Sequence, residues 1–509
     1  MLDWAPWPGT SWGPPLSTVQ ASPPAVGTGS VVGLRRNAIG LREVLFQSVT
    51  AMAPGAAIAA SIPAGAAFAG GALPLSVLVA LVACLFTALS IGELASHLPS
   101  SGSVATYTAQ GLHPGIGFLV GWTYVFVELL VPPLLFLQLG FTMAGTLHDQ
   151  NSSLSAGLWW PWALAGAVIV LLAGYYGVTA SAKLGTILGA FEIAVFLVFA
   201  ILLVVKAGSH NTLSVFTTAH TPTDHKGLVG VIAGSVYTVL AFSGFEAAAP
   251  LAEEAKDPKR TIRRAIVGAT LGIGALYVFA TYAITVAFGP DKFASFGTSG
   301  PDSWQGVAQA SYGFFWLLVF FAIINSTIGN ANAGASVSTR TAYALGRIRL
   351  LPRMVTILHP KTGSPYYAVL AQFVIGVAVT LGLGFAYDPL TAFLIVATVI
   401  VLVVVLVYIL CNLACIGFFL RKRREDLNWF LHVLIPVLGV IAFVPALFTA
   451  AGVPVFSFVV PLTAPVSYAG PIVGVWILIG LAYLVFLTNK HPERVQQMSQ
   501  VHLTEDVDA

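Results

Sequence analysis

Apolar residues form long runs along this chain, and short polar or charged segments separate the runs. A helix needs about 20 mostly apolar residues to cross the hydrocarbon core of a bilayer. Twelve runs have about this length or more, with approximate bounds 42–69, 74–97, 116–147, 160–178, 181–206, 228–252, 262–288, 309–346, 366–386, 389–420, 431–451 and 469–488. The pattern predicts an all-α integral membrane protein with 12 transmembrane helices. The third, eighth and tenth runs are long enough to tilt or to extend beyond the bilayer.

The composition agrees with a membrane protein and excludes several classes of function. Hydrophobic residues make up 57% of the 509 residues and charged residues only 8%, whereas soluble domains carry about 25% charged residues. All three cysteines, Cys84, Cys411 and Cys415, lie inside apolar runs, so neither a disulfide framework nor a metal site is expected. The chain shows no phosphate-binding glycine loop and no nucleophile paired with a base. We therefore expect no cofactor, no enzymatic activity, no ATP-driven pump and no nucleic-acid partner.

Polar segments divide the chain into three predicted parts. Residues 1–34 are rich in Pro, Gly, Ser and Trp and are expected to be a disordered cytoplasmic tail without a cleavable signal peptide. A twelve-helix transporter domain follows over 35–490, and 491–509 form a second cytoplasmic tail. Within the domain, helices one to five occupy about 42–206, helices six to ten about 228–420, and helices eleven and twelve about 431–488.

The basic residues predict the orientation. With both termini in the cytoplasm, the outer segments contain only Lys206, Lys226 and Lys292 of the 23 Lys and Arg residues. This asymmetry follows the tendency of cytoplasmic loops to carry an excess of Lys and Arg. The basic run at 421–424 either anchors the end of helix ten or binds lipid headgroups. A multi-pass protein of the plasma or inner membrane is expected.

Two predicted spans contain helix-breaking residues near their middle. The first span has Pro54-Gly55 within AMAPGAA, and the sixth has Ser243-Gly244 within AFSGFEA. Irregular backbone at membrane depth is tolerated only where it is buried in protein or lines a cavity. Interrupted spans in corresponding positions of two halves indicate a transporter binding site. The alternative is a pair of packing kinks, since Gly and Pro are common in membrane helices.

Three motifs resemble the amino acid–polyamine–organocation superfamily of permeases. ELASHLPSSGSVATYTAQGLHPGIGFLVGW at 93–122 is similar to the family's segment from helix two into helix three. FSGFEAAAPLAEEAKDPKRTIRRAI at 242–266 is similar to its helix six and the following loop. RTAYALGRIRLLPRMVTILHPKTGSPYYAV at 340–369 is similar to its link from helix eight to helix nine. The resemblance covers about residues 35–490.

The resemblance implies a five-plus-five inverted repeat with discontinuous helices 1 and 6, and alternating access around a midplane site. A substrate carboxylate would meet backbone amides near Ala53, Pro54, Gly55, Ala56 and Ala57, although Pro54 has no N–H. A substrate amine would meet carbonyls near Leu240, Ala241 and Phe242, where Gly244 lets the backbone open. AMAPGAA departs from the Gly-Ser-Gly of many relatives. Leu240 aligns with a gating aromatic residue of some relatives, so Phe242 or Phe245 takes that role, or the site admits a bulkier ligand.

Three carboxylates fall at predicted bilayer depth, where a charge is costly and usually functional. Glu128 in span three, with Tyr124 on the same face by the family alignment, is expected either to pair with a cationic group of the substrate or to carry a coupling proton. Glu192 in span five is the expected coupling residue, because burial disfavours its charged form and lets it load and release a proton. It could also ligate sodium. Glu246 follows the second break and is expected to act at the inner gate or to offset a half-helix dipole. For each of the three, the alternative is a structural side chain.

Other polar residues have weaker indications. Span eight contains Asn325, Ser326, Thr327, Asn330 and Asn332, which are expected mainly to bind neighbouring helices, with lining of the cavity as the alternative. Glu93, at the cytoplasmic end of span two, is expected to be a cap or a gate partner.

The leading interpretation is a secondary active transporter of amino acids or related organic cations, coupled to protons by symport or exchange, with sodium as the second candidate ion. Glu128 favours a cationic substrate, whereas a carboxylate pocket in helix one favours amino acids over polyamines. The alternatives are a polyamine transporter and a nutrient sensor with a transporter fold.

Overall fold

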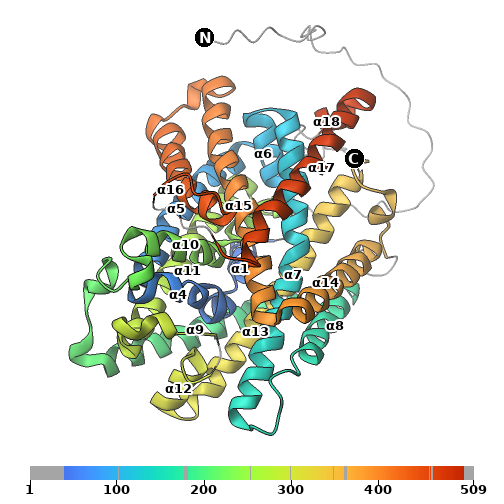
Figure 1. The fold of residues 1–509 in the computed structure, drawn as a ribbon. Coiled ribbons are helices and arrows are strands. Elements are labelled where there is room, and N and C mark those ends of the chain that lie inside the picture. The colour runs from blue at the N-terminus through green and yellow to red at the C-terminus, as the bar shows by residue number, and fades with distance from the viewer. Residues whose placement is uncertain are drawn as a thin grey trace, which may run out of the picture. The chain divides into compact units, whose positions relative to one another are not determined.

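The computed structural model describes residues 39–497 except 101, 177–180, 253, 299, 348, 360–363, 458, 460 and 461. The predicted N-terminal tail, residues 1–34, lies outside the described residues, as do 498–509 of the C-terminal tail. Figure 1 shows an assembly of helices. Within the described part no strand occurs, and the isolated bridge between Ile39 and Ala255 is the only β-type pairing. The prediction of an all-α protein is confirmed.

Eleven helical segments in the described part are long and apolar enough to cross a membrane. They are Leu41–Ala64 (α1, Leu41–Met52, to α3, Ile62–Ala64), Ala66–His97 (α4, Ala66–Ala69, and α5, Leu73–His97), α7 (Pro114–Gln150), Thr186–His210 (mostly α9, Ser181–Ala207), Leu228–Leu251 (α10, Leu228–Phe242, and η6, Phe245–Leu251), α11 (Pro258–Phe288), α13 (Phe315–Arg347), α14 (Tyr366–Tyr387), α15 (Pro389–Arg421), Phe430–Ala451 (η10, Phe430–Leu434, and α16, Ile435–Ala451) and Val466–Lys490 (mostly α17, Ala469–Lys490). The remaining predicted span, 160–178, corresponds to the shorter apolar helix α8 (Trp160–Tyr176), which is followed by residues outside the described part.

The predicted eighth span, about 309–346, corresponds to α13 and starts later than predicted. A short helix, α12 (Trp304–Tyr312), ends at Gly313, and α13 starts at Phe315. Gly313 has φ 51° and caps α12. Glycine adopts this left-handed conformation without the steric cost that a Cβ imposes. The apolar residues on both sides hide this turn from a hydropathy pattern.

The first interrupted span breaks at Ala53. This residue has φ 46° and ψ 69° and ends α1, and α2 (Pro54–Ala56) begins directly after it. A left-handed conformation costs an L-residue about 1–2 kcal/mol, and Pro54 is favourable at the first helical position because no N–H is needed there. The backbone then continues as a π-helical turn, η1 (Ala57–Ser61). The break therefore lies one residue before the predicted Pro54-Gly55.

The second interrupted span breaks at the predicted dipeptide. Ser243 has φ −54° and ψ 131°, Gly244 has φ 105°, and η6 starts at Phe245. The two breaks are in contact, because a Cβ at Gly244 would lie 2.8 Å from the carbonyl oxygen of Ala51. In addition, Ser48 Oγ donates a hydrogen bond of 2.7 Å to the carbonyl of Phe245. The irregular backbone of both spans is thus gathered in one buried place.

Predicted cytoplasmic segments contact one another at one end of the helices, which we call the basic end. Here Arg263 Nη2 of α11 lies 2.6 Å from Glu93 Oε1 of α5, and Arg340 Nη1 of α13 lies 3.1 Å from Glu254 Oε1. Short helices α6 (Ser103–Gly111) and α18 (Pro492–Gln497) lie at this end, opposite α12 (Figure 1). Some of the predicted cytoplasmic basic residues lie outside the described residues: Arg35, Arg36, Lys361 and the side chain of Lys183.

Predicted outer segments contact one another at the opposite end. His220 Nδ1 lies 2.7 Å from Asp291 Oδ1, and Lys206 Nζ donates to Ser311 Oγ at 2.8 Å. These contacts join the segments after α9 and α11 and the segment before α13. The sorting of segments into two ends therefore agrees with the predicted order of spans.

Candidate substrate site

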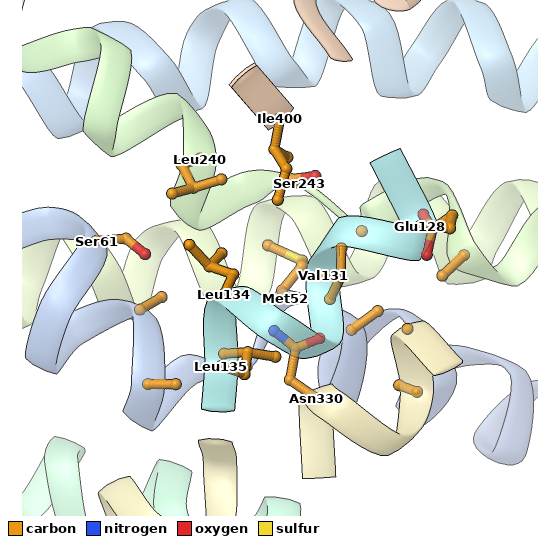
Figure 2. Close-up of a pocket in the computed structure, with 18 of the residues that line it drawn as sticks. Met52, Ser61, Glu128, Val131, Leu134, Leu135, Leu240, Ser243, Asn330 and Ile400 are labelled. Atoms are coloured by element: carbon orange, nitrogen blue, oxygen red, sulfur yellow. The ribbon is translucent and has the colours of Figure 1, made fainter. Parts of the chain in front are cut away.

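A small cavity lies where the two helix breaks meet. Its volume is about 40 Å³, and its walls come from the broken first and sixth spans, α7, α13 and α15. Figure 2 shows Glu128 on one side of it and Ser61 and Leu240 on the other. Six of the predicted site residues line the cavity: Ala53, Ala56, Ala57, Glu128, Leu240 and Gly244.

The wall is mostly apolar and carries one ionisable side chain among the described residues. Ser61, Gln138, Ser243 and Asn330 supply neutral polar groups, and Glu128 supplies the carboxyl group. Such a composition is typical of small-molecule sites, in which a few placed polar groups fix the orientation of the ligand.

Glu128 is nearly buried, with 8% of its surface exposed. Tyr124 precedes it by one turn of α7, is also buried, and interacts electrostatically with it, although Tyr124 itself does not line the cavity. Glu246 adds a second negative charge near Glu128. Two buried carboxylates repel unless a proton or a cation neutralises one of them, so this region favours a positive group.

The first broken span offers few free amides. The N–H of Ala53 donates to the carbonyls of Val49 and Thr50, and the N–H of Ala57 donates to the carbonyl of Ala53 at 2.8 Å. Gly55 and Ala56 stand in the first turn of α2, where N–H groups have no partner in the helix. Only Ala56 of these two lines the cavity.

Gly55 has a packing role in addition. A Cβ at this position would lie 2.9 Å from the carbonyl oxygen of Ala322 and 3.0 Å from Ser326 Cβ. The glycine therefore allows α2 to approach α13 closely, away from the cavity.

The aromatic residues of the sixth span point elsewhere. The ring of Phe242 packs against Tyr277 of α11 at 5.3 Å, and the ring of Phe245 packs against Tyr408 of α15 at 5.0 Å. Neither lines the cavity, nor does Ala241, whereas Leu240 and Gly244 do. Of the residues Leu240, Phe242 and Phe245, only Leu240 therefore lines the cavity wall.

Two side chains that the sequence analysis did not single out hold the first break from both sides. The Tyr277 hydroxyl donates to the carbonyl of Met52 at 2.7 Å, just before Ala53. Gln138 Nε2 donates to the carbonyl of Ala56 at 2.9 Å, just after it. The carbonyls of Met52 and Ala56, on the two sides of the break, thus both accept hydrogen bonds from side chains of other helices. The sequence contained one indication of Gln138, because a polar glutamine interrupts the apolar run LLFLQLGF.

Glu246 is bonded inside the protein and does not line the cavity. Its Oε2 accepts a hydrogen bond of 2.7 Å from the Tyr408 hydroxyl and one of 3.2 Å from the N–H of Gly244. The carboxyl group therefore satisfies the first backbone donor after the break and ties it to α15.

Glu192 occupies a separate buried position on α9, with 2% of its surface exposed. It lies near Ser326 and Asn325 of α13, and it is within electrostatic range of Tyr277. Because Tyr277 bonds the carbonyl of Met52, Glu192 lies behind the first break and outside the cavity wall.

Span eight combines both expected roles. Asn330 lines the cavity, whereas Asn325 Nδ2 donates to the carbonyl of Leu188 on α9 at 3.2 Å. Within the described residues, no group of three His, Cys, Asp or Glu side chains is arranged to hold a metal ion.

Replacing Gly244 by alanine is expected to lower the thermal stability of the protein in detergent. The new Cβ would meet the Ala51 backbone at 2.8 Å, and φ 105° is strained for any L-residue. A cost of about 1–3 kcal/mol follows from such strain and overpacking. The matched control is Gly272→Ala in α11, where no atom lies within 4 Å of the added Cβ and the helix gains propensity. Equal unfolding temperatures for the two variants would contradict the contact between the breaks.

Comparison with known proteins agrees with the geometry. The sequence profile described as "Amino acid permease" matches residues 41–482. The chain belongs to the amino acid permease family. The permease is 27% identical over 441 residues to the low-affinity putrescine importer PlaP of Escherichia coli K12, covering 85% of this chain and 89% of PlaP. It is 27% identical over 450 residues to the branched-chain amino acid permease BcaP of Bacillus subtilis 168, covering 84% and 88%. It is 28% identical over 313 residues to the histidine permease HisP of Lactococcus lactis, covering 57% and 61%.

The family membership confirms the predicted resemblance and the general function. The permease is a multi-pass membrane transporter for amino acids or related organic cations, and it is not an enzyme. Its substrates are small molecules.

Proposed function

We propose that this permease carries an amino acid or amine whose positive group is recognised by Glu128. The observation that carries the proposal is the place of Glu128, which is the one ionisable side chain lining the cavity between the two helix breaks in the described structure. A buried carboxylate is costly unless a positive group compensates it. The ammonium group of an amino acid or diamine is such a group.

The small cavity supports transport by alternating access. A volume of about 40 Å³ holds a few water molecules, whereas small-molecule sites have about 300–1,000 Å³. The walls must separate to admit a substrate, and both breaks meet in these walls. Interrupted helices allow the half-helices to move while the midplane site is kept.

The proposed architecture has 12 spans, with a five-plus-five inverted repeat over the first ten. The apolar helix α8 supplies the span beyond the eleven long ones, and the two breaks fall five spans apart. The proposed location is the plasma or inner membrane. Both termini and the basic end are placed in the cytoplasm, because only Lys206, Lys226 and Lys292 of the Lys and Arg residues fall on the other side.

Proton coupling is proposed for Glu192. It is buried, lies outside the cavity and sits next to the first break through Tyr277, so its protonation could change the position of that break. Sodium bound by the same carboxylate is the second candidate. Glu246 is proposed as a brace of the second break, given its bonds to Gly244 and Tyr408.

A thermal-shift screen tests the substrate class. Purified permease is heated with lysine, histidine, putrescine, leucine and glutamate in separate samples. Ligands with an amino group and no net negative charge are expected to raise the unfolding temperature, because binding to the folded state adds stability that grows with ligand concentration. A shift by glutamate alone would contradict recognition by Glu128.

The relatives' names leave two substrate types in view, since one is a putrescine importer and another a branched-chain amino acid permease. Ala56 stands in the first turn of α2 and lines the cavity, which supports an amino acid whose carboxylate accepts from backbone N–H groups there. A stronger shift by putrescine than by every amino acid would favour a polyamine transporter. A ligand that binds but does not cross proteoliposome membranes under any gradient would favour a nutrient sensor.

A further inference from the structure

A second cluster of ionisable groups, around a buried carboxylate, lies at the basic end, away from the substrate cavity. Its centre is Glu93, whose side chain is 7% exposed. Arg263 of α11 binds Glu93 Oε1 at 2.6 Å, and His432 of η10 faces Glu93 Oε2 with its Nε2 at 3.7 Å. One carboxylate therefore joins α5, α11 and the start of the α16 span.

The His432 ring contacts a neighbouring aromatic ring, a backbone N–H and a carboxylate. It stacks on Phe419 of α15, with ring centroids 3.5 Å apart and an interplanar angle of 8°. Its Nδ1 lies 3.0 Å from the backbone N–H of Asn428, which donates to it. The side chain is only 5% exposed, although Asn428 belongs to an exposed loop.

These contacts define the protonation state of the ring. An Nδ1 that accepts a hydrogen bond carries no proton, so the proton of neutral His432 is on Nε2 and points toward Glu93. Adding a second proton at Nδ1 would place two N–H donors against each other at Asn428. The turn from Asn428 to His432 would then have to open. This turn is also closed by a 2.8 Å hydrogen bond from the N–H of His432 to the carbonyl of Asn428.

The charges around His432 act in opposite senses: the Glu93 carboxylate, 3.7 Å from Nε2, attracts the charged ring, whereas Arg263 repels it. With His432 neutral, Glu93 and Arg263 balance each other. With His432 charged, one carboxylate faces two cations, and the two cations repel. Other ionisable groups near the cluster are His97 of α5, whose Nε2 lies 3.8 Å from Asp426; Arg423, 3.9 Å from Asp426; and the buried thiol of Cys415 beside Glu93.

We propose that His432 is a proton-binding site at the basic end, distinct from the substrate cavity and from Glu192, and that its protonation separates the loop before α16 from α11. The neutral ring stabilises the junction of α5, α11, α15 and α16, and the charged ring releases it. The site senses the proton concentration on the side of the basic end and does not depend on proton-coupled transport.

Distances between two spin labels, measured by electron–electron double resonance, test this proposal. Spin labels are attached to cysteines introduced as Arg260→Cys and Glu425→Cys, at side chains 76% and 75% exposed on the start of α11 and on the loop before α16. The native cysteines are buried. Samples are prepared from about pH 8 to about pH 5, the range in which a histidine titrates. We expect a longer distance component whose share rises as the pH falls.

Variants of His432 and His97 show which of the two histidines causes the pH-dependent change in distance. His432→Asn retains an acceptor near the position of Nδ1 and does not titrate, so it should remove the pH dependence and keep the short distance. His97→Asn should leave the pH dependence unchanged. If His432→Asn does not fold, His432→Gln takes its place.

Two results would overturn the proposal. One is a distance distribution that does not change between the two pH values in the doubly labelled protein with His432 intact. The other is a pH-dependent change that persists without His432, or that disappears without His97. Neither result bears on substrate recognition by Glu128 or on coupling by Glu192, so the proposals fail separately.

Discussion

The Glu128→Gln variant is expected to bind cationic substrates about 100-fold more weakly than the wild type while it still folds. The amide keeps the size of the side chain and removes the charge from the cavity wall. Loss of one partner of a buried charge pair costs about 3–5 kcal/mol, which corresponds to a factor of 100 or more. Binding is measured by titration calorimetry with the strongest ligand of the thermal-shift screen and with a neutral analogue of similar shape.

The matched control is Glu192→Gln, which removes another buried carboxyl group, outside the cavity wall. It should leave the dissociation constant within a few-fold. If Glu128→Gln weakens charged and neutral ligands equally, Glu128 has a structural role and the proposed recognition is wrong.

Glu192→Gln is expected to abolish uphill transport driven by a pH gradient and to retain exchange of substrate across the membrane. A glutamine cannot load or release a proton, whereas the substrate cavity, which Glu192 does not line, remains intact. Uptake of labelled substrate is measured in proteoliposomes with an imposed pH gradient, and exchange is measured without a gradient and with unlabelled substrate inside. Uphill accumulation should fall to the equilibrium level.

A sodium gradient in place of the pH gradient separates the two candidate ions. Wild-type accumulation with sodium alone, lost in Glu192→Gln, would replace the proton by sodium at the same residue. Undiminished pH-driven accumulation in the variant would show that Glu192 is not the coupling group. Glu246→Gln is a useful comparison, since its carboxyl group is bonded to Tyr408 and to Gly244 and is expected to affect stability more than coupling.

Much of the site region was predictable from local signals. Ser243-Gly244 was predicted as a break, and the structure places the change of backbone direction there. In the first span the predicted Pro54-Gly55 was one residue late, because proline prefers the first position of the following helix and leaves the preceding residue, Ala53, to make the turn. Six predicted residues line one cavity.

The residues that hold the first break in place were not predictable. Tyr277 bonds Met52 across 225 positions of the chain, and Gln138 bonds Ala56 across 82. Such bonds depend on which helices become neighbours, which periodicity does not show. The same applies to His432, whose Nδ1 accepts a hydrogen bond from Asn428 on its own turn and whose Nε2 faces Glu93, which is far away in the sequence.

Three properties were predictable from the amino-acid sequence: that the chain spans a membrane, which ends of its helices lie together, and where two helices are interrupted. These properties follow from local rules, because a bilayer requires long apolar helices and tolerates irregular backbone only where protein surrounds it. Which of the three buried carboxylates faces the cavity became clear only from the packing of the helices. Glu128 lines it, Glu246 is bonded to Tyr408 and Gly244, and Glu192 lies near α13. A carboxylate's role depends on its partners, and the partners come from helices that only packing brings together.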